Sequence, residues 1–385
     1  MGRSFRVGSI FGVDIKVHPT FVLIVLWIIY QWGIVADAGV RGIIFGTAVV
    51  IAVFGCVLAH ELAHGMVAMR HGLKVEDITL LPIGGVARIE HVAMTPRMET
   101  VIALAGPAMN FAIAAALTPL VLIVAVVTSA GEALGYLVYP DQLSFIGFII
   151  YLWIANIILA AFNLAPAFPM DGGRILRAQL ARTRSRLRAT QLAVGIGQMM
   201  AISLAIVGFI STNYLLLFVA AFILIYAQIE SRYVYLESRL RQLPVGQFAL
   251  WDTGGIHPRA SLAWATRGGP RDLVVTENGQ VVGMLWRRDL LRHLNGSHHD
   301  LTVRDIMDRQ FHPVHAYDSV YDVHLWLSDT SRSAVPVIED GQYRGIFTGE
   351  RLVHVYQTLG GREWLSYRNL AIPVLQRIGI APRRA

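Results

Sequence analysis

The sequence AHELAH, residues 59–64, lies inside a long apolar run, residues 42–69. On an α-helix, residues four apart lie one above the other, so His60 and His64 share one face of that helix. Two neutral imidazoles at this spacing can bind one Zn²⁺, and Glu61 can take a proton from a water that the metal activates. The alternative is a pair of core histidines, but ionisable residues in a membrane-length helix are costly and mark functional sites.

The composition indicates a membrane protein with a soluble part. Hydrophobic residues make up 55% of the 385 residues and charged residues only 15%, which indicates several membrane spans. Most acidic residues follow position 230, so we expect a soluble domain after the membrane domain. The net charge of +7 comes largely from arginines beside apolar runs, which indicates membrane topology and no nucleic-acid partner. A single cysteine, Cys56, excludes an intrachain disulfide.

Six apolar runs have about the length that a bilayer requires. They cover residues 20–36, 42–69, 100–127, 144–169, 190–211 and 213–229, and the segment before them alternates in a way that predicts short strands. Lys and Arg gather before the first run, after the sixth, and in alternate loops between them. By the positive-inside rule this pattern predicts a multi-pass protein of the plasma membrane with both termini in the cytoplasm. The predicted fold is therefore a polytopic α-helical membrane domain with six transmembrane helices, residues 1–243.

A zinc site with two histidines needs a third protein ligand and an open position for water. In the predicted topology the second and fourth spans both run toward the cytoplasm, so their ends reach a similar depth. At the end of the fourth span the sequence reads NLAPAFPMDGGR, residues 163–174, and offers the carboxylate of Asp171. Pro166 and Pro169 interrupt the helix, and the freed backbone groups can meet a substrate. On these residues alone, a proline-rich helix end followed by a glycine turn remains the alternative.

Together these two stretches resemble the HExxH and NxxPxxPxDGG motifs of the site-2 protease family, which are intramembrane zinc metalloproteases. The sequence AGPAMN, residues 105–110, is similar to the family's third-span motif, and Gly84-Gly85 to its loop that re-enters the membrane. The resemblance covers residues 5–230. It implies one zinc ion per chain bound by His60, His64 and Asp171, a catalytic base at Glu61, and substrate binding by Asn163, Gly84 and Gly85.

Three further residues have side chains that can ligate metals. Cys56 lies one helical turn before His60 on the same face, but a free cysteine is commonly a small buried hydrophobe, so we expect it to pack. We expect His18, beside a proline, to be an interfacial anchor and His91 to be a loop residue.

After Pro244 the pattern changes to short β-like runs and soluble helices. The sequence VTENGQVVG, residues 275–283, aligns with VIEDGQYRG, residues 337–345. Each predicts two strands that reverse at Asn-Gly or Asp-Gly and a helix after them. We therefore predict a cytoplasmic α/β domain in two copies, followed by a basic tail. The copies cover about residues 244–299 and 300–361, and the tail covers residues 362–385.

The repeat resembles tandem CBS domains, whose usual partners are adenosine nucleotides. Ligand sites in that family use a Thr or Ser and an Asp three residues later. The first copy has Asp289, but Trp286 replaces the hydroxyl, and the second has Thr348, but Arg351 replaces the carboxylate. The resemblance implies that an adenine nucleotide contacts Asp289 and Thr348. The alternative is a plain packing module or one that forms a homodimer.

These features together predict a zinc-dependent endopeptidase that cleaves transmembrane segments of membrane-tethered proteins, as in regulated intramembrane proteolysis, with modulation by the CBS domains. Its expected partners are the lipid bilayer and transmembrane protein substrates, which must unwind locally before their carbonyls can be attacked. A metal-ion transporter or channel regulated by CBS domains is the alternative. Glu61 separates the two hypotheses, because a permeation path needs no base beside its ligands.

Overall fold

The computed structural model describes residues 4–82, 84–89, 94–127, 144–252, 254–267, 269, 271–294, 301–330 and 332–360. His91 and the predicted basic tail, residues 362–385, lie outside the described residues. The chain divides into two compact units, and the division falls between Val234 and Tyr235. The predicted domain boundary after residue 243 stays a prediction.

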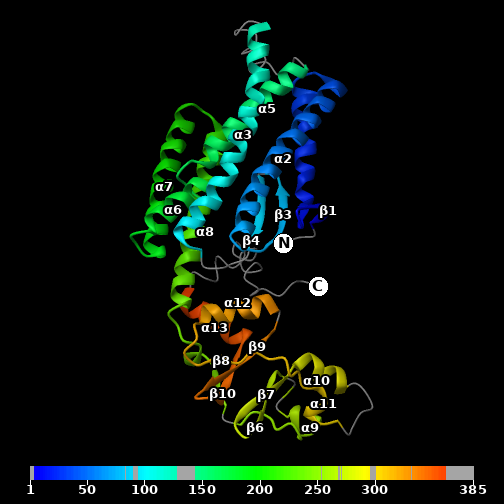
Figure 1. Ribbon diagram of the computed structural model, residues 1–385, viewed down its shortest axis with the longest axis vertical. Coiled ribbons are helices and arrows are strands. Elements are labelled where there is room, and N and C mark those ends of the chain that lie inside the picture. Colours follow the sequence, from blue (N-terminus) through cyan, green and yellow to red (C-terminus); the bar gives the residue numbers. More distant parts are fainter. Residues whose placement is uncertain are drawn as a thin grey trace. The chain divides into compact units, whose positions relative to one another are not determined.

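Long apolar helices make up the first unit. Within the described residues, five helices are long and apolar enough to cross a membrane: α2 (Gly39–Arg70), α3 (Pro96–Val127), α5 (Phe145–Asn163), α7 (Arg186–Ile210) and α8 (Tyr214–Leu240). The first predicted span is a shorter apolar run in which a 3₁₀ turn (Pro19–Phe21), α1 (Val22–Ile28) and a π-helical segment (Ile29–Val35) follow one another. Helix α3 packs along both α2 and α5 (Figure 1).

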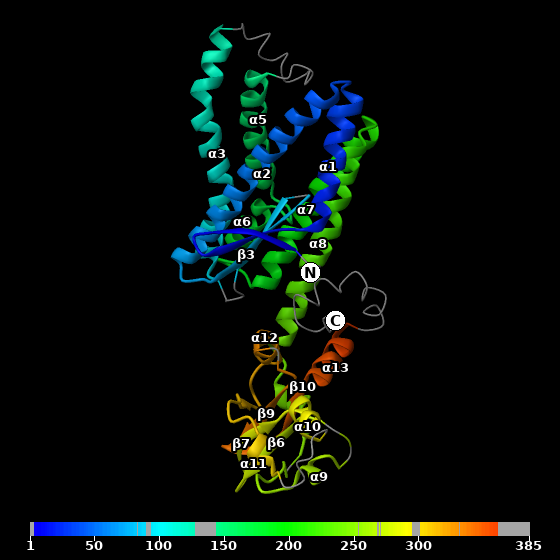
Figure 2. The same ribbon diagram turned by 90° about the vertical axis from the view of Figure 1, so that its right-hand side faces the viewer.

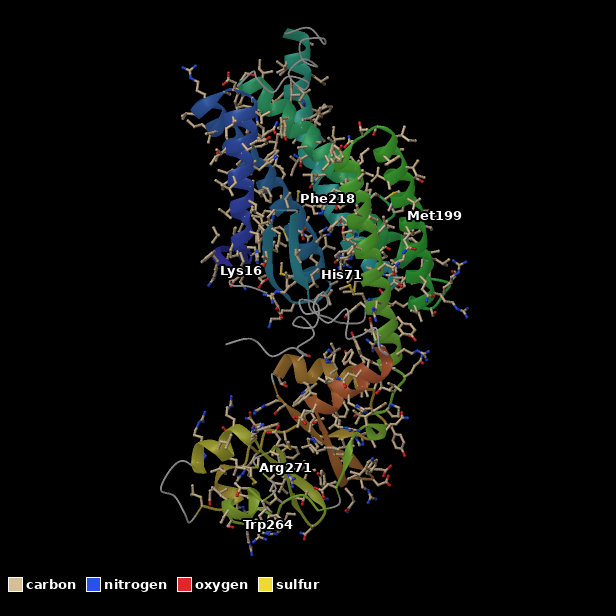
Figure 3. The ribbon with its side chains drawn as sticks, turned by 180° about the vertical axis from the view of Figure 1, so that it is seen from behind. Lys16, His71, Met199, Phe218, Trp264 and Arg271 are labelled. Atoms are coloured by element: carbon tan, nitrogen blue, oxygen red, sulfur yellow. The ribbon has the colours of Figure 1, made fainter. Side chains whose placement is uncertain are left out.

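The outward faces of these helices carry large apolar side chains. Met199 of α7 and Phe218 of α8 are 63% and 65% exposed and are labelled in Figure 3. An apolar surface this exposed suits lipid tails and not water. The chain is therefore a membrane protein.

The fourth apolar run divides into two helices. Helix α5 ends at Asn163, earlier than predicted, and a non-helical segment, residues 164–170, leads into α6 (Asp171–Leu180). Pro166 and Pro169 account for the break, because proline lacks an N–H and disfavours helix at the residue before it. Asp171 is thus the first residue of a new helix, where the alternative hypothesis expected a turn.

A four-stranded sheet packs beside α2 (Figure 2). Its strands are β1 (Phe5–Ile10), β2 (Val13–Val17), β3 (Val75–Leu81) and β4 (Gly84–Ile89), in that order. Strands β2 and β3 are parallel and the outer pairs are antiparallel. The first two strands confirm the prediction for the N-terminal segment. Gly84 and Gly85, which are similar to the family's loop that re-enters the membrane, lie at the start of the edge strand β4, where Gly84 pairs with Leu81.

Asp77 fixes the register of this sheet from the middle of β3. Its side chain is only 1% exposed and accepts hydrogen bonds from Lys16 of β2, at 2.5 Å, and from Arg88 of β4. Burial acts to raise the pKa of the Asp77 carboxyl, but the hydrogen bonds from Arg88 and Lys16 outweigh it and hold this pKa below its ordinary value. Strands β2 and β4 are therefore both tied to β3 by charge.

The second unit contains the predicted repeat. The first copy has α9 (Leu262–Ala265), β6 (Leu273–Glu277), β7 (Gln280–Leu285) and α10 (Arg287–Leu294). The second has β8 (Val314–His315), α12 (Val320–Thr330), β9 (Ala334–Glu339), β10 (Gln342–Thr348) and α13 (Gly349–Gly360). Three further elements are not part of the repeated arrangement of two strands and a helix. They are a 3₁₀ turn (Val245–Gln247), β5 (Leu250–Trp251) and α11 (Val303–Ile306).

Both predicted hairpins are present and reverse in the same way. Asn278 and Gly279 have φ angles of 55° and 80°, and Asp340 and Gly341 have 53° and 75°. Two consecutive positive φ angles define the type I′ turn that these dipeptides favour. The copies pack against each other through a shared apolar cluster of Val274, Met284, Trp286, Ala334 and Tyr343.

Candidate metal centre

The two histidines of α2 and the first residue of α6 meet at one point. The Nε2 atoms of His60 and His64 are 3.1 Å apart, and Asp171 Oδ2 lies 3.2 Å from the first and 3.1 Å from the second. All three side chains are buried. In the part of the chain that the structure describes, this is the group of His, Cys, Asp and Glu side chains with metal-binding geometry.

The donor set fits zinc. Two imidazole nitrogens and one carboxylate oxygen form a nearly equilateral triangle. Ligand atoms about 2.0–2.1 Å from a tetrahedral Zn²⁺ lie about 3.3 Å from one another, close to the separations of this triangle. Three protein ligands leave a fourth position open, as catalytic zinc sites do.

Helix α3 contacts both histidines and fixes the orientation of His64 by a hydrogen bond. His64 Nδ1 donates a hydrogen bond to the backbone carbonyl of Ile102, at 2.6 Å, which leaves the Nε2 lone pair directed at the centre. Gly106, one turn further along α3, lies directly against both rings. A Cβ atom at this position would lie 2.3 Å from His64 Nε2 and 2.5 Å from His60 Nε2. Gly106, the glycine of the AGPAMN stretch, is therefore needed because a side chain here would collide with both histidine rings.

Two glycines place Asp171 at the centre. A Cβ atom at Gly172 would lie 2.2 Å from the carbonyl oxygen of Leu164, and one at Gly173 would lie 2.6 Å from the carbonyl carbon of Ala167. The start of α6 therefore packs on the preceding non-helical segment at a distance that only glycine allows. Arg174 lies 4.0 Å from the second carboxylate oxygen of Asp171.

Glu61 lies beside the start of the edge strand. A Cβ atom at Gly85 would lie 2.4 Å from Glu61 Cγ, so the carboxylate side chain packs on the backbone of β4. The other long edge of β4 has no partner strand in the described part of the sheet. The candidate base and an open strand edge are thus adjacent.

Other sequence candidates do not join the centre. Asn163 Nδ2 donates to the Leu159 carbonyl of its own helix, at 2.9 Å. The Cys56 thiol is buried, as predicted, and accepts a hydrogen bond from Asn156. His18 accepts a hydrogen bond from the Thr20 backbone N–H and so caps the 3₁₀ turn.

Two buried polar features escaped the sequence analysis. Arg177 of α6 forms ion pairs with Glu99 of α3 and Glu230 of α8. Asn110 of α3 is 1% exposed, and neither polar atom of its amide has a hydrogen-bond partner among the described residues. In each case the available signal was a polar residue in an apolar helix, which calls for a partner or a function.

In the second unit, the candidate nucleotide-contacting residues make contacts within their own copy. Thr348 Oγ1 accepts the backbone N–H of Arg351 at the start of α13. Asp289 lies 3.6 Å from Arg292 of the same helix. Trp286, which stands where the family has a hydroxyl, is buried and donates to Asp308 at 2.9 Å.

The paired histidines, the carboxylate and the adjacent glutamate within a bundle of apolar helices define a zinc metallopeptidase of the membrane. Comparison with known proteins agrees. The profile of Peptidase family M50 matches residues 48–139 and 138–207, and that of the CBS domain matches residues 303–357. Zinc metalloprotease MJ0392 of Methanocaldococcus jannaschii is 30% identical over 95% of this chain and 99% of its own length.

Among solved structures, the Site-2 Protease from Methanocaldococcus jannaschii shares 34% identity, covers 60% of this chain and 95% of its own, and gives a TM-score of 0.43. The chain belongs to peptidase family M50, the site-2 proteases, and is a zinc metalloprotease of the site-2 type that also carries CBS domains.

Proposed function

We propose that His60, His64 and Asp171 hold one zinc ion per chain and that Glu61 is the catalytic base of an intramembrane endopeptidase. One observation carries this proposal. The Asp171 carboxylate, from a helix that starts after the proline break, lies within 3.2 Å of both imidazoles of α2. Two residue types that are remote in sequence thus complete a zinc donor set in an apolar bundle.

The zinc ligands and Glu61 have separate roles in the proposed peptide hydrolysis. Zinc held by the three ligands would act as a Lewis acid toward the scissile carbonyl and the attacking water. Glu61 takes a proton from that water as its oxygen bonds to the carbonyl carbon. The same carboxyl then gives the proton to the departing amide nitrogen when the C–N bond breaks. Glu61 packs on Gly85, so its position relative to strand β4 is fixed.

The substrate is proposed to bind as an extended strand. A transmembrane helix hides its carbonyls in internal hydrogen bonds, so it must unwind before attack. The free edge of β4, which begins at Gly84 and Gly85, offers backbone donors and acceptors to such a strand. Asn163 is proposed to steady the strand or the developing oxyanion, after its side chain leaves the Leu159 carbonyl.

An apolar hollow of about 380 Å³ supports a route for the substrate helix. It is lined by residues of α1, α2 and α5 and by Pro82, two residues before the start of β4. Side chains of a substrate helix that enter this hollow would lie next to Pro82, close in sequence to the start of β4. We expect Val53→Trp, which fills the hollow, to raise KM for a membrane substrate while zinc content stays unchanged. Unchanged KM would place the route elsewhere.

Membrane topology follows from charge and helix length. We propose six transmembrane helices in the plasma membrane, with the run Pro19–Val35 as the first and both termini in the cytoplasm. The alternate basic loops support this arrangement. Cysteine labelling with a membrane-impermeant reagent from each side tests it, with labelling of a C-terminal cysteine only after permeabilisation as the expected result.

For the second unit we propose that the CBS pair modulates cleavage and that an adenine nucleotide contacts Asp289 and Thr348. The packing or homodimer module is the alternative, and the local contacts of both residues favour it. Calorimetric titration of the full-length protein with AMP and with ATP distinguishes the two. If the wild type shows heat of binding and Thr348→Ala does not, the result supports nucleotide binding at Thr348. Concentration-dependent dimerisation without nucleotide binding supports the alternative.

Glu61→Gln tests the catalytic proposal. The variant keeps the zinc ligands, so zinc content should equal that of the wild type, while cleavage of a model transmembrane substrate should fall by about 10²- to 10⁴-fold or more, the contribution of a general base. Retained cleavage would overturn the proposal. Zn²⁺ transport by purified protein in lipid vesicles, unaffected by Glu61→Gln, would instead favour the transporter hypothesis.

A further inference from the structure

A buried guanidinium joins three helices of the first unit. Arg177 of α6 is 5% exposed and forms ion pairs with Glu99 at the start of α3 and with Glu230 of α8. Its Nε atom donates to Glu99 Oε1 at 3.0 Å. We call these three residues the Arg177 triad. Each of its members comes from a different helix, so the triad fixes α6 relative to both neighbours.

Arg177 also contacts the segment that precedes Asp171. Arg177 lies six residues after Asp171 on the same short helix, and its guanidinium stacks on Phe168, 5.2 Å from the ring centroid. Phe168, in the non-helical segment just before α6, is 2% exposed. Arg177 therefore contacts the chain ahead of Asp171 and anchors the helix behind it. A shift of this guanidinium would move the carboxylate at the centre.

Helix α8 extends beyond the first unit. Glu230 lies on it within the first unit, whereas Leu240, its last residue, is 1% exposed in the main apolar cluster of the second. That cluster also includes Val245, Val320 and Val355 of the second unit. Ten residues of α-helix span about 15 Å without a break. Glu230 and Leu240 therefore belong to one continuous helix.

We propose that Arg177 is a positioning residue that ties α6 to α8, so that the packing of the CBS unit around Leu240 sets the placement of Asp171 at the zinc centre. A buried ion pair adds little net stability relative to well-packed apolar side chains, and one attested role of such pairs is to specify geometry. The inference rests on the proposed zinc ligands and adds to them a path for regulation through residues of this chain.

Glu230→Gln is the direct test, with Glu237→Gln as its matched control. The first variant leaves Arg177 paired with Glu99, so the protein retains one buried ion pair and should fold. Glu237 lies on the same helix, but its ion pair is with Arg241, four residues on. We expect Glu230→Gln to weaken zinc binding, measured by competition with a chromogenic chelator, by about 10- to 100-fold. Glu237→Gln should leave it within about twofold.

A double-mutant cycle tests the path through α8. Leu240→Ala alone should weaken zinc binding, and it should have no further effect in Glu230→Gln because the link to α6 is already cut. In Glu99→Gln, which keeps the Arg177–Glu230 pair, the effect of Leu240→Ala should persist. Additive effects of Leu240→Ala and Glu230→Gln within about twofold would overturn the inference.

Failure of this inference can be told from failure of the proposed function. If His60→Ala binds zinc as well as the wild type, the proposed ligands are wrong. If His60→Ala loses zinc but Glu230→Gln binds it with unchanged affinity, the ligands stand and the positioning role of Arg177 is wrong. Thermal unfolding of each variant identifies any that fail to fold. If Glu230→Gln does not fold, the zinc affinity of Leu240→Ala is compared in the presence and absence of Glu99→Gln instead.

Discussion

The candidate zinc centre and the CBS pair differ in how their candidate ligand atoms are arranged. In the first unit, Asp171 Oδ2 and two imidazole nitrogens are directed at one another across 3.1–3.2 Å. In the second, Thr348 accepts the backbone N–H of its own helix start, and Asp289 lies beside Arg292. The first three atoms come from two helices that are remote in the sequence and form a triangle of a size that suits a zinc ion, whereas Thr348 and Asp289 make contacts within their own copies of the repeat. Among these candidate ligand atoms, those of the first unit meet at one point and those of the second do not.

The largest expected effect breaks the zinc side of this contrast. Gly106→Ala places a Cβ atom 2.3 Å from His64 Nε2, so we expect zinc content to fall to background and cleavage to be lost. The measurement is metal analysis of the purified protein. Gly55→Ala on α2, where a Cβ atom meets nothing within 4 Å, is the control and should keep full zinc. Full zinc in Gly106→Ala would show that the rings do not face α3.

The next prediction separates metal binding from base catalysis. Gly85→Ala places a Cβ atom 2.4 Å from Glu61 Cγ and displaces this carboxylate without touching the ligands. We expect kcat to fall by about 10²- to 10⁴-fold, since that is what a positioned general base contributes. Zinc content should be unchanged. Unchanged kcat would mean that Glu61 does not act from this position.

Asp77 tests how charge supports the strand edge beside the centre. Its pKa is held below the ordinary value in the folded protein, so its contribution to stability is complete above about pH 4 and is lost as the pH falls through the folded-state pKa. Asp77→Asn should therefore lower the free energy of unfolding by about 2 kcal/mol at pH 7 and by less at pH 3. Denaturation in detergent at both pH values measures this, and equal losses at both would contradict it.

Asn110 extends the comparison to a buried amide that has no hydrogen-bond partner among the described residues. Because both polar atoms of its buried amide lack a hydrogen bond among the described residues, Asn110→Leu should raise the free energy of unfolding by about 1–3 kcal/mol. Thermal unfolding of the zinc-loaded protein measures the gain. Asn156→Leu is the comparison. This change removes hydrogen bonds to Cys56 and Leu152, so it should raise the free energy of unfolding by less than Asn110→Leu does. A loss of stability in Asn110→Leu would mean that water satisfies the amide.

The smallest effect is expected in the CBS unit. Thr348→Ala removes the hydroxyl that accepts the N–H of Arg351, and loss of a helix cap costs about 1 kcal/mol. Thr348→Ser keeps the hydroxyl and should restore the stability. Zinc content and basal cleavage should match the wild type in both. A large change in basal cleavage would show that Thr348 acts on the active site even without a nucleotide.

The sequence was most informative where one local rule sufficed. Helix periodicity placed His60 and His64 on one face, and the Asn-Gly and Asp-Gly dipeptides set both hairpin turns. The proline pair located the break ahead of Asp171, although α5 ends at Asn163, several residues before the predicted end of the span.

Features that depend on contacts between remote segments could not be predicted. Gly85 belongs to an edge strand because β4 pairs with β3, and nothing local distinguishes this from a loop. The pairing of Arg177 with Glu99 and Glu230 needs the packing of three helices. Likewise, Thr348 matches one position of a ligand motif, but its hydroxyl is used locally.

The proposed binding of substrate at the edge of β4, which has no partner strand among the described residues, has a consequence for the choice of bond. An edge strand recognises main-chain N–H and C=O groups, which every residue carries, so it discriminates little among side chains. Selection then depends on how readily a given stretch leaves the helical state. Substrates with glycine, proline or asparagine near the scissile bond should be cut fastest, and an uninterrupted leucine helix should resist.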